Sequence, residues 1–143
     1  MKHKLINDDT QKTFAIILDS GDEVMENILS FARQQKVHAS QFNAIGAFSQ
    51  VTLGYFDFNI KDYQKIEVVE QVEVLNISGD ISQYENEYKV HAHVVLGKKD
   101  GTAHGGHLMK AIVHPTLEII LTESPAYLKR EMDKDSGLPL IKV

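Results

Sequence analysis

The sequence contains no cysteine and only three prolines among its 143 residues. The lack of cysteine excludes disulfide bonds, thiolate catalysis and zinc sites built on cysteine. No apolar run approaches the length of a membrane-spanning helix, and the polar first twelve residues lack the apolar segment of a secretory signal. No Pro-rich linker and no internal repeat divides the chain. We therefore expect one cytoplasmic domain over residues 1–143.

The chain also lacks an excess of positive charge. Its 15 lysine and arginine residues stand against 20 aspartate and glutamate residues, a net charge of −5 with a pI of about 5.8. A protein that binds nucleic acid without sequence preference needs a positive field to displace counterions from phosphate. The composition argues against such binding by the chain as a whole. A local basic face remains an open alternative, and it would need Lys61, Lys65, Lys98 and Lys99.

The pattern of apolar residues predicts a sheet covered by one helix. Ser20 and Glu23 have the spacing of a capping box, which predicts a long helix that ends near Lys36. Alternating or β-branched stretches predict six or seven strands, over residues 12–18, 37–47, 50–58, 66–81, 88–96, 102–113 and 116–122. Short turns join them, so the sheet should be largely antiparallel. The helix then packs on one face, which is an α/β fold of the α+β type.

Two further stretches carry weaker signals. Ser78-Gly79-Asp80 is a pattern that normally marks a turn. The mixed charges of residues 126–136 predict a short helical turn followed by a final extended segment. We expect the charges of this tail to face solvent.

Histidines are concentrated in one part of the chain, with five of the seven between residues 88 and 123. At the period of a strand, His91 and His93 share one face, and the opposite face is apolar, with Val90, Ala92, Val94 and Leu96. An apolar face is typical of a strand packed on a core. The two histidines therefore lie away from that core, about 7 Å apart along the strand.

A hairpin brings a third histidine to the same face. Residues 98–101 form a turn signal in which Asp-Gly is the strongest part. A five-residue loop over 97–101 sets His91 opposite His107, and a slip of two residues sets His93 opposite His107 instead. In either register three imidazoles converge, with directly opposed Cβ atoms about 5 Å apart. A slip of one residue would send His107 to the other face.

Three imidazoles on a rigid sheet suit a divalent metal ion such as zinc, and a tetrahedral ion would keep one position for water or a ligand. The predicted ligands are His91, His93 and His107. Glu118 is a candidate partner that orients one of the rings, although it could equally face solvent. The alternative interpretation is that the three histidines are half-exposed and only form hydrogen bonds.

Two other histidines could join this cluster. A regular strand points His104 away from it, but a bulge at Gly105-Gly106 would reverse that direction. His38 lies near the start of another predicted strand, where a surface position or a helix-end position is the simpler interpretation.

The same stretch resembles a known family, the plants-and-prokaryotes conserved (PPC) domain. The family is marked by a strand with alternating histidines, an Asp-Gly turn, a Gly-Gly-His-Leu segment and a closing strand with a glutamate. Here these are His91 and His93, Asp100-Gly101, residues 105–108 and Glu118. The similarity extends over about residues 10–142 and includes residues 78–82, 21–24, 44–47, 53–57 and 129–138.

The resemblance implies an α/β domain that assembles as a homotrimer. It carries over the histidines as metal ligands, with Gly105 and Gly106 as neighbours of the site and candidates for ligand contact. Plant members of the family are fused to AT-hook segments that bind the minor groove of AT-rich DNA. This sequence has no Arg-Gly-Arg-Pro and no basic arm, so the DNA-binding part of the plant proteins has no counterpart in it.

Three functions stay open from the sequence. The first is a trimeric regulatory or ligand-binding module that holds a divalent ion, with a small ligand at the metal. The second is a DNA-binding or transcription-associated protein, which only the family resemblance supports. The third is a metal-dependent hydrolase-like enzyme in which zinc activates water and Glu118 is the general base. The sequence shows no nucleophile motif, no Walker segment and no dinucleotide fingerprint.

Overall fold

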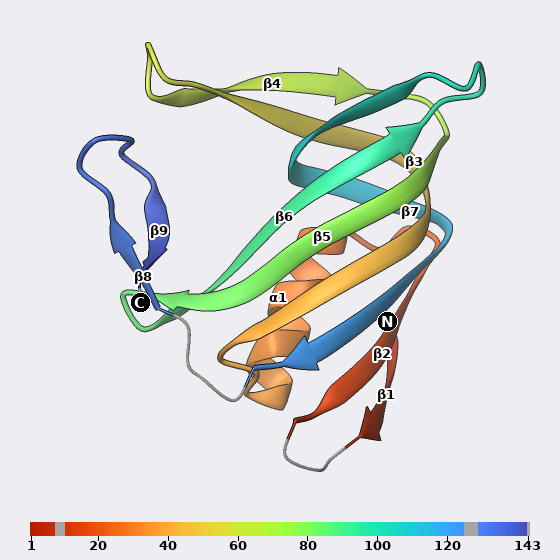
Figure 1. The fold of residues 1–143 in the computed structure, drawn as a ribbon. Helices are drawn as coiled ribbons and strands as arrows, with labels where there is room; N and C mark the ends of the chain where they lie inside the picture. The colour runs from red at the N-terminus through yellow and green to blue at the C-terminus, as the bar shows by residue number, and fades with distance from the viewer. Residues whose placement is uncertain (8–10, 125–128, 143) are drawn as a thin grey trace.

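The computed structural model describes residues 1–7, 11–124 and 129–142. In this part of the chain, one helix and nine strands form the fold (Figure 1). Their bounds are β1 Lys2–Asn7, β2 Thr13–Asp19, α1 Val24–Gln35, β3 Ser40–Asp57, β4 Asp62–Val68, β5 Val72–Tyr84, β6 Glu87–Gly97, β7 Ala103–Glu123, β8 Lys129–Met132 and β9 Pro139–Lys142. No helix within these residues has the length and apolar character needed to cross a membrane.

The strands form one sheet that curves back on itself. Its main path is β1-β2-β7-β3-β5-β8-β9, with β4 paired to β3 and β6 paired to both β5 and β7. Because β7, β3, β5 and β6 pair in a ring, the centre of the sheet is closed. Register shifts in the β3–β7 pairing, between Gly46 and Phe48 and again between Thr52 and Leu53, let these long strands bend. The bend of β7 is visible in Figure 1.

The prediction of a largely antiparallel sheet is confirmed, but the number of strands was too low. All pairings between strands are antiparallel except the parallel contact of β5 with β8, so the sheet is mixed. Residues 37–47 and 50–58 belong to one strand, β3, because the bulges bend the backbone without breaking its pairing. In the same way β7 continues through the cis peptide bond between His114 and Pro115.

The helix packs on the concave face of the sheet, as expected, but it is short. It has 12 residues, and its N-cap is Glu23, whose carboxylate accepts a hydrogen bond from the backbone N–H of Glu26 at 2.7 Å. The predicted cap, Ser20, lies in a turn instead, because Gly21 takes a left-handed conformation with φ of 94° and the chain reverses there. The helix ends at Lys36, which is also left-handed.

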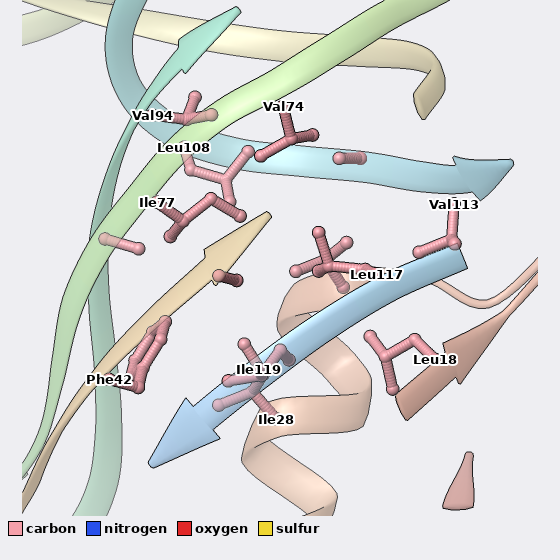
Figure 2. Close-up of a cluster of buried hydrophobic side chains, with 14 of the residues drawn as sticks. Leu18, Ile28, Phe42, Val74, Ile77, Val94, Leu108, Val113, Leu117 and Ile119 are labelled. Atoms are coloured by element: carbon pink, nitrogen blue, oxygen red, sulfur yellow. The ribbon is translucent and has the colours of Figure 1, made fainter. Parts of the chain in front are cut away.

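One apolar core fills the space between α1 and the sheet. Figure 2 shows Ile28 of the helix beside Leu117 and Ile119 of β7, with Phe42 of β3 and Ile77 of β5 further along the same core. All five are at most 1% exposed. The predicted apolar stripe of the helix is therefore correct, and the core face of β6 is the predicted one, with Ala92, Val94 and Leu96 buried.

The turn expected at residues 78–80 is wrong, because this segment lies inside β5. Gly79 permits a close approach: a Cβ atom there would lie 2.4 Å from Cζ of Phe42. The glycine thus serves packing of the Phe42 ring against the strand rather than chain reversal.

The C-terminal tail also differs from expectation. Lys129–Met132 is a strand that pairs with Pro139–Lys142, not a helical turn, and residues 125–128 lie outside the described part of the chain. The charges of the tail do not all face solvent, since Arg130 is 8% exposed. Its buried guanidinium attaches this hairpin to the sheet.

Candidate metal centre

The site lies where strands β6 and β7 part. Their hairpin pairs Gly97 with Ala103 and continues in regular register to His93 opposite His107. The loop is therefore residues 98–102, closed by hydrogen bonds from Lys98 N to Thr102 O and from Gly101 N to Lys98 O, both 2.9 Å. Of the two predicted registers, the one that sets His93 opposite His107 is correct.

Beyond this pair the two strands diverge. In the described residues the β6–β7 pairing ends at His93 and His107, whereas β6 stays paired with β5 as far as Glu87. We call this place the fork. His91 lies two residues past the last pair, so no residue of β7 is paired with it, and its ring lies 5.2 Å from that of His107 across the opening between the strands.

The structure brings the three predicted ligands together at the fork. The ring centroids of His91, His93 and His107 lie 5.1, 5.2 and 5.4 Å apart in pairs. One nitrogen from each ring can be chosen so that all three lie within 4.8 Å of one another. Donor atoms about 2.1 Å from a shared zinc ion would be separated by roughly 3.4 Å in a tetrahedron. The ring nitrogens therefore lie close together, up to about 1.4 Å further apart than a bound ion would hold them.

An aromatic ring covers the third histidine. The ring of Tyr63, on β4, lies 4.7 Å from that of His107 between centroids. Gly54 makes room for it, because a Cβ atom at that position would be 2.8 Å from Cδ1 of Tyr63. His107 is half-buried as a result, and its Nδ1 is buried without a hydrogen-bond partner.

Burial also keeps these rings neutral. It lowers the pKa of His107 from 6.5 to about 4, with further lowering from the charges of His91, His93 and Lys89. Burial and the charge of His91 lower the pKa of His93 as well. A neutral imidazole is the form that binds a metal, so both rings are in the ligand form at neutral pH.

A buried network on β5 and β8 supports the remaining histidine. Asp80 lies opposite His91 in the β5–β6 register, and its Oδ2 is 3.6 Å from Nδ1 of His91. Arg130 donates from Nη2 to both oxygens of Asp80, at 2.8 and 2.9 Å, and from Nε to Ser82 Oγ at 2.6 Å. Nη2 of Arg130 also lies 3.4 Å from Nδ1 of His91, so Asp80 and Arg130 together occupy the Nδ1 side of the ring and leave Nε2 as the nitrogen for a metal.

These contacts determine the charge of Asp80. Burial by itself raises the pKa of this carboxyl, but hydrogen bonds from His91, Arg130 and Ser82 and the charge of Arg130 outweigh it and lower the pKa. Sequence reasoning missed all of this network. The family resemblance includes residues 78–82 and 129–138, but the Ser-Gly-Asp pattern indicated a turn, and no role in the site was assigned to Asp80 or Arg130.

The other candidates lie elsewhere. Glu118 is exposed and pairs with Ile17 and Ile45, whereas His107 pairs with Gly54, nine residues along β3 from Ile45. The structure thus does not bring Glu118 to the histidines. His104 is exposed on the other face of β7, opposite Leu96.

Gly105 and Gly106 serve strand packing. Cβ atoms there would lie 3.0 Å from the backbone oxygens of Val94 and Gly54, respectively, so their absence lets β6, β7 and β3 approach closely. The pairing stays regular across them, without the bulge that would redirect His104. His38 stacks on Tyr88 at 5.2 Å, apart from the cluster.

Two hollows adjoin the histidines. One, of about 320 Å³, is lined by His91, His107, Tyr63 and Arg130 together with mainly apolar side chains. The other is lined by His91 and His93 with polar groups that include Asp80 and Ser78. Both give a small molecule or water access to the three rings.

The comparisons with known proteins agree with this architecture. The profile of the Plants and Prokaryotes Conserved (PCC) domain, the family called PPC above, matches residues 6–125. A comparison with curated proteins gives no match. Among solved structures, a metal-containing protein of Archaeoglobus fulgidus is 32% identical with a TM-score of 0.85, over 99% of this chain and 97% of that one.

Two further structures have the same fold. A plant- and prokaryote-conserved protein of Pyrococcus horikoshii is 29% identical with a TM-score of 0.86, over 99% of this chain and 95% of that one. A protein of Ralstonia eutropha described as a candidate DNA-binding protein is 28% identical with a TM-score of 0.85, over 91% and 90% of the two chains.

Proposed function

Since the chain belongs to the Plants and Prokaryotes Conserved domain family, we propose that it is a metal-binding module of this family with a regulatory or ligand-binding role. His91, His93 and His107 would hold one divalent ion. The observation that carries this proposal is the convergence of three ring nitrogens within 4.8 Å from two paired strands. The metal-containing relative from Archaeoglobus fulgidus supports it.

The donor set favours zinc among the common divalent ions. All three donors are imidazole nitrogens, which suit zinc, whereas magnesium and calcium prefer oxygen ligands. Burial keeps His93 and His107 neutral, and Asp80 orients His91. The ion, when bound, would tie β6 to β7 at the fork and leave a coordination position for water or a ligand.

The binding role is favoured over catalysis by the surroundings of the fork. The general base considered from the sequence, Glu118, lies away from the histidines. The carboxylate that does lie near them, Asp80, is held by Arg130 at 2.8 and 2.9 Å and has a lowered pKa. A carboxylate in that state is a weak base for activating water.

DNA binding is the alternative that the description of the Ralstonia eutropha relative suggests for this chain. Of the lysines required for a basic face, Lys98 forms an ion pair with Glu70 at 2.6 Å, which offsets its charge. With a net charge of −5, we expect no submicromolar binding to random duplex DNA at physiological salt. A gel shift that weakens steeply with added salt would contradict this expectation.

We also propose that the chain self-associates, as the family resemblance implies for a trimer. Strand β4 and the end of β3 project from the body of the sheet in Figure 1. This arm exposes large apolar side chains, among them Tyr55, Phe58, Ile60 and Val69. Light scattering at micromolar concentration should give about three times 16.1 kDa, and a clean monomer would rule out the trimer.

Elemental analysis of protein purified without a histidine tag tests the metal site. We expect close to one equivalent of a transition metal per chain, retained through gel filtration and removed by a chelator. Protein that carries no metal as purified and binds none when zinc is added would contradict the proposed function.

A further inference from the structure

The mainly apolar hollow at the fork, lined by His91 and His107, is more than a metal ion requires. Its volume of about 320 Å³ lies at the lower end of the range of small-molecule pockets. It begins at His91 and His107 and extends between β6 and β7, where these strands have parted and α1 contacts both. Hydrated ions need polar surroundings, so the apolar part of this hollow calls for a different occupant.

One side of the hollow is apolar and comes from three separate parts of the fold. The helix contributes one side chain, the diverging strands contribute three, and the C-terminal hairpin contributes three: Met25, Val90, Leu108, Met109, Leu138, Pro139 and Leu140. A surface of this kind gains stability by burying apolar groups of a ligand.

The C-terminal hairpin is fixed in place as a wall. Arg130 donates from Nη1 to the backbone oxygen of Pro139 at 2.9 Å, while its Nη2 holds Asp80. The same side chain therefore connects the hairpin, the carboxylate behind His91 and the edge of the hollow. This buried network makes the hollow a preformed site.

The polar end carries positive charge. Besides the histidines, Lys89 and Arg130 are the charged residues that line the hollow. The charge of Arg130 is balanced by Asp80 at 2.8 Å, whereas the charge of Lys89 is not matched by a carboxylate within the lining. A divalent ion on the histidines would add to this excess, so an anionic group is favoured at this end.

We propose that the hollow binds a small carboxylic acid with an apolar tail. The carboxylate lies toward the metal ion and Lys89, and the tail lies between Leu108 and the C-terminal hairpin. This inference rests on the proposed metal site and adds to it the class of ligand that the fork selects.

Calorimetry on the zinc-loaded protein tests the two halves of the ligand separately. The probes are 3-methylbutanoate, acetate, which has the carboxylate alone, and 3-methylbutan-1-ol, which has the tail alone. Burial of three further carbon atoms should make 3-methylbutanoate bind at least about tenfold tighter than acetate. The alcohol should bind more weakly than 3-methylbutanoate, because it brings no negative charge to the metal.

Matched variants locate the binding in this hollow. Leu140 and Ile141 are both partly exposed, at 45% and 39%, but Leu140 lines the hollow and Ile141 does not, so Leu140→Glu places a carboxylate at the hollow and Ile141→Glu is the matched control. We expect Leu140→Glu to weaken 3-methylbutanoate binding at least about tenfold and Ile141→Glu to leave it unchanged. Lys89→Gln should weaken both carboxylates severalfold, whereas Lys99→Gln, in the turn, should weaken neither.

The outcomes separate this inference from the proposed function. If the protein holds zinc but binds acetate and 3-methylbutanoate equally, or neither, the ligand assignment is wrong and the metal site stands. If Leu140→Glu and Ile141→Glu weaken 3-methylbutanoate binding alike, the ligand lies elsewhere. If zinc does not bind to the histidines at all, the proposed function fails, and this inference fails with it.

Discussion

Each end of the β6–β7 hairpin has a histidine and a nearby aspartate, which is on β5 at the fork, but the consequences are opposite. At the turn end, His104 and Asp100 are exposed, and Asp100 accepts hydrogen bonds from the N–H and hydroxyl of Thr102. At the fork, His107 is half-buried under Tyr63, and Asp80 is held by Arg130. The difference teaches that strand pairing itself does not make a site. The site forms where pairing stops and other elements close over the gap.

The largest expected effect comes from removing a ligand at the fork. His107→Ala should raise the dissociation constant for zinc by more than about 100-fold, because even an outer partner of a ligand is typically worth 10–100-fold. His91→Ala and His93→Ala should act alike. The matched change at the turn end, His104→Ala, should leave affinity unaltered in a competition titration with a zinc chelator. Equal losses of zinc affinity in His104→Ala and His107→Ala would contradict the proposed difference between the two ends of the hairpin.

The next effect concerns the carboxylates at the two ends. Asp80→Asn removes the charge that balances buried Arg130, so the free energy of unfolding should fall by roughly 3 kcal/mol. Zinc affinity should fall about tenfold or more, since His91 loses its orienting partner. Asp100→Asn should change zinc affinity little. Denaturant unfolding and zinc competition measure the two quantities. Unchanged zinc affinity in Asp80→Asn would show that Asp80 does not position His91.

A smaller effect is expected of pH on the free energy of unfolding of the metal-free protein. In the metal-free protein, the pKa of His107 is lowered to about 4, while in the unfolded chain it is near 6.5. Between these values the unfolded chain binds a proton that the folded protein does not, so the free energy of unfolding decreases as pH falls from about 6.5 toward 4. This stabilisation is fully present above pH 6.5.

Denaturant unfolding of the metal-free protein at pH 7 and pH 5 checks this sign. His107→Ala should show a weaker dependence on pH than the unmodified protein, and His104→Ala should behave as the unmodified protein does. Stability that rises on acidification over this interval would contradict the assignment of a buried, neutral ring at position 107.

The sequence was sufficient to predict the face of the strand on which His91 and His93 lie. Alternation of apolar residues from Val90 to Leu96 determines the core face of the strand. It follows directly that His91 and His93 lie on the opposite face. The register was ambiguous by two residues, but both options bring His107 to the same face. The candidate ligands could therefore be predicted before the pairing was known.

The supporting residues could not be predicted in this way. Asp80 and Arg130 are 50 positions apart, and no local pattern records a contact of that kind. Gly79 has the local preference of a turn residue, yet its missing side chain admits Phe42 and keeps β5 continuous. Glu118 was predicted from its strand face and from the family pattern, and neither fixes how far along the strand it lies from the histidines.

The helix start was misplaced for a related reason. Ser20 and Glu23 satisfy the capping-box spacing, but Gly21 reverses the chain first, and the carboxylate of Glu23 takes over the cap. The same carboxylate accepts a hydrogen bond from the backbone N–H of Ala111 at 3.1 Å, which fastens the helix start to β7. Such a tertiary contact lies beyond a local pattern.

Anomalous diffraction from crystals of zinc-loaded protein, measured on both sides of the zinc absorption edge, tests the central claim most directly. The account predicts one strong peak per chain at the fork, about 2.1 Å from a ring nitrogen of each of His91, His93 and His107. It also predicts loss of that peak in His107→Ala and its retention in His104→Ala. A peak bound at other residues, or no peak at the fork in crystals soaked with excess zinc, would contradict it.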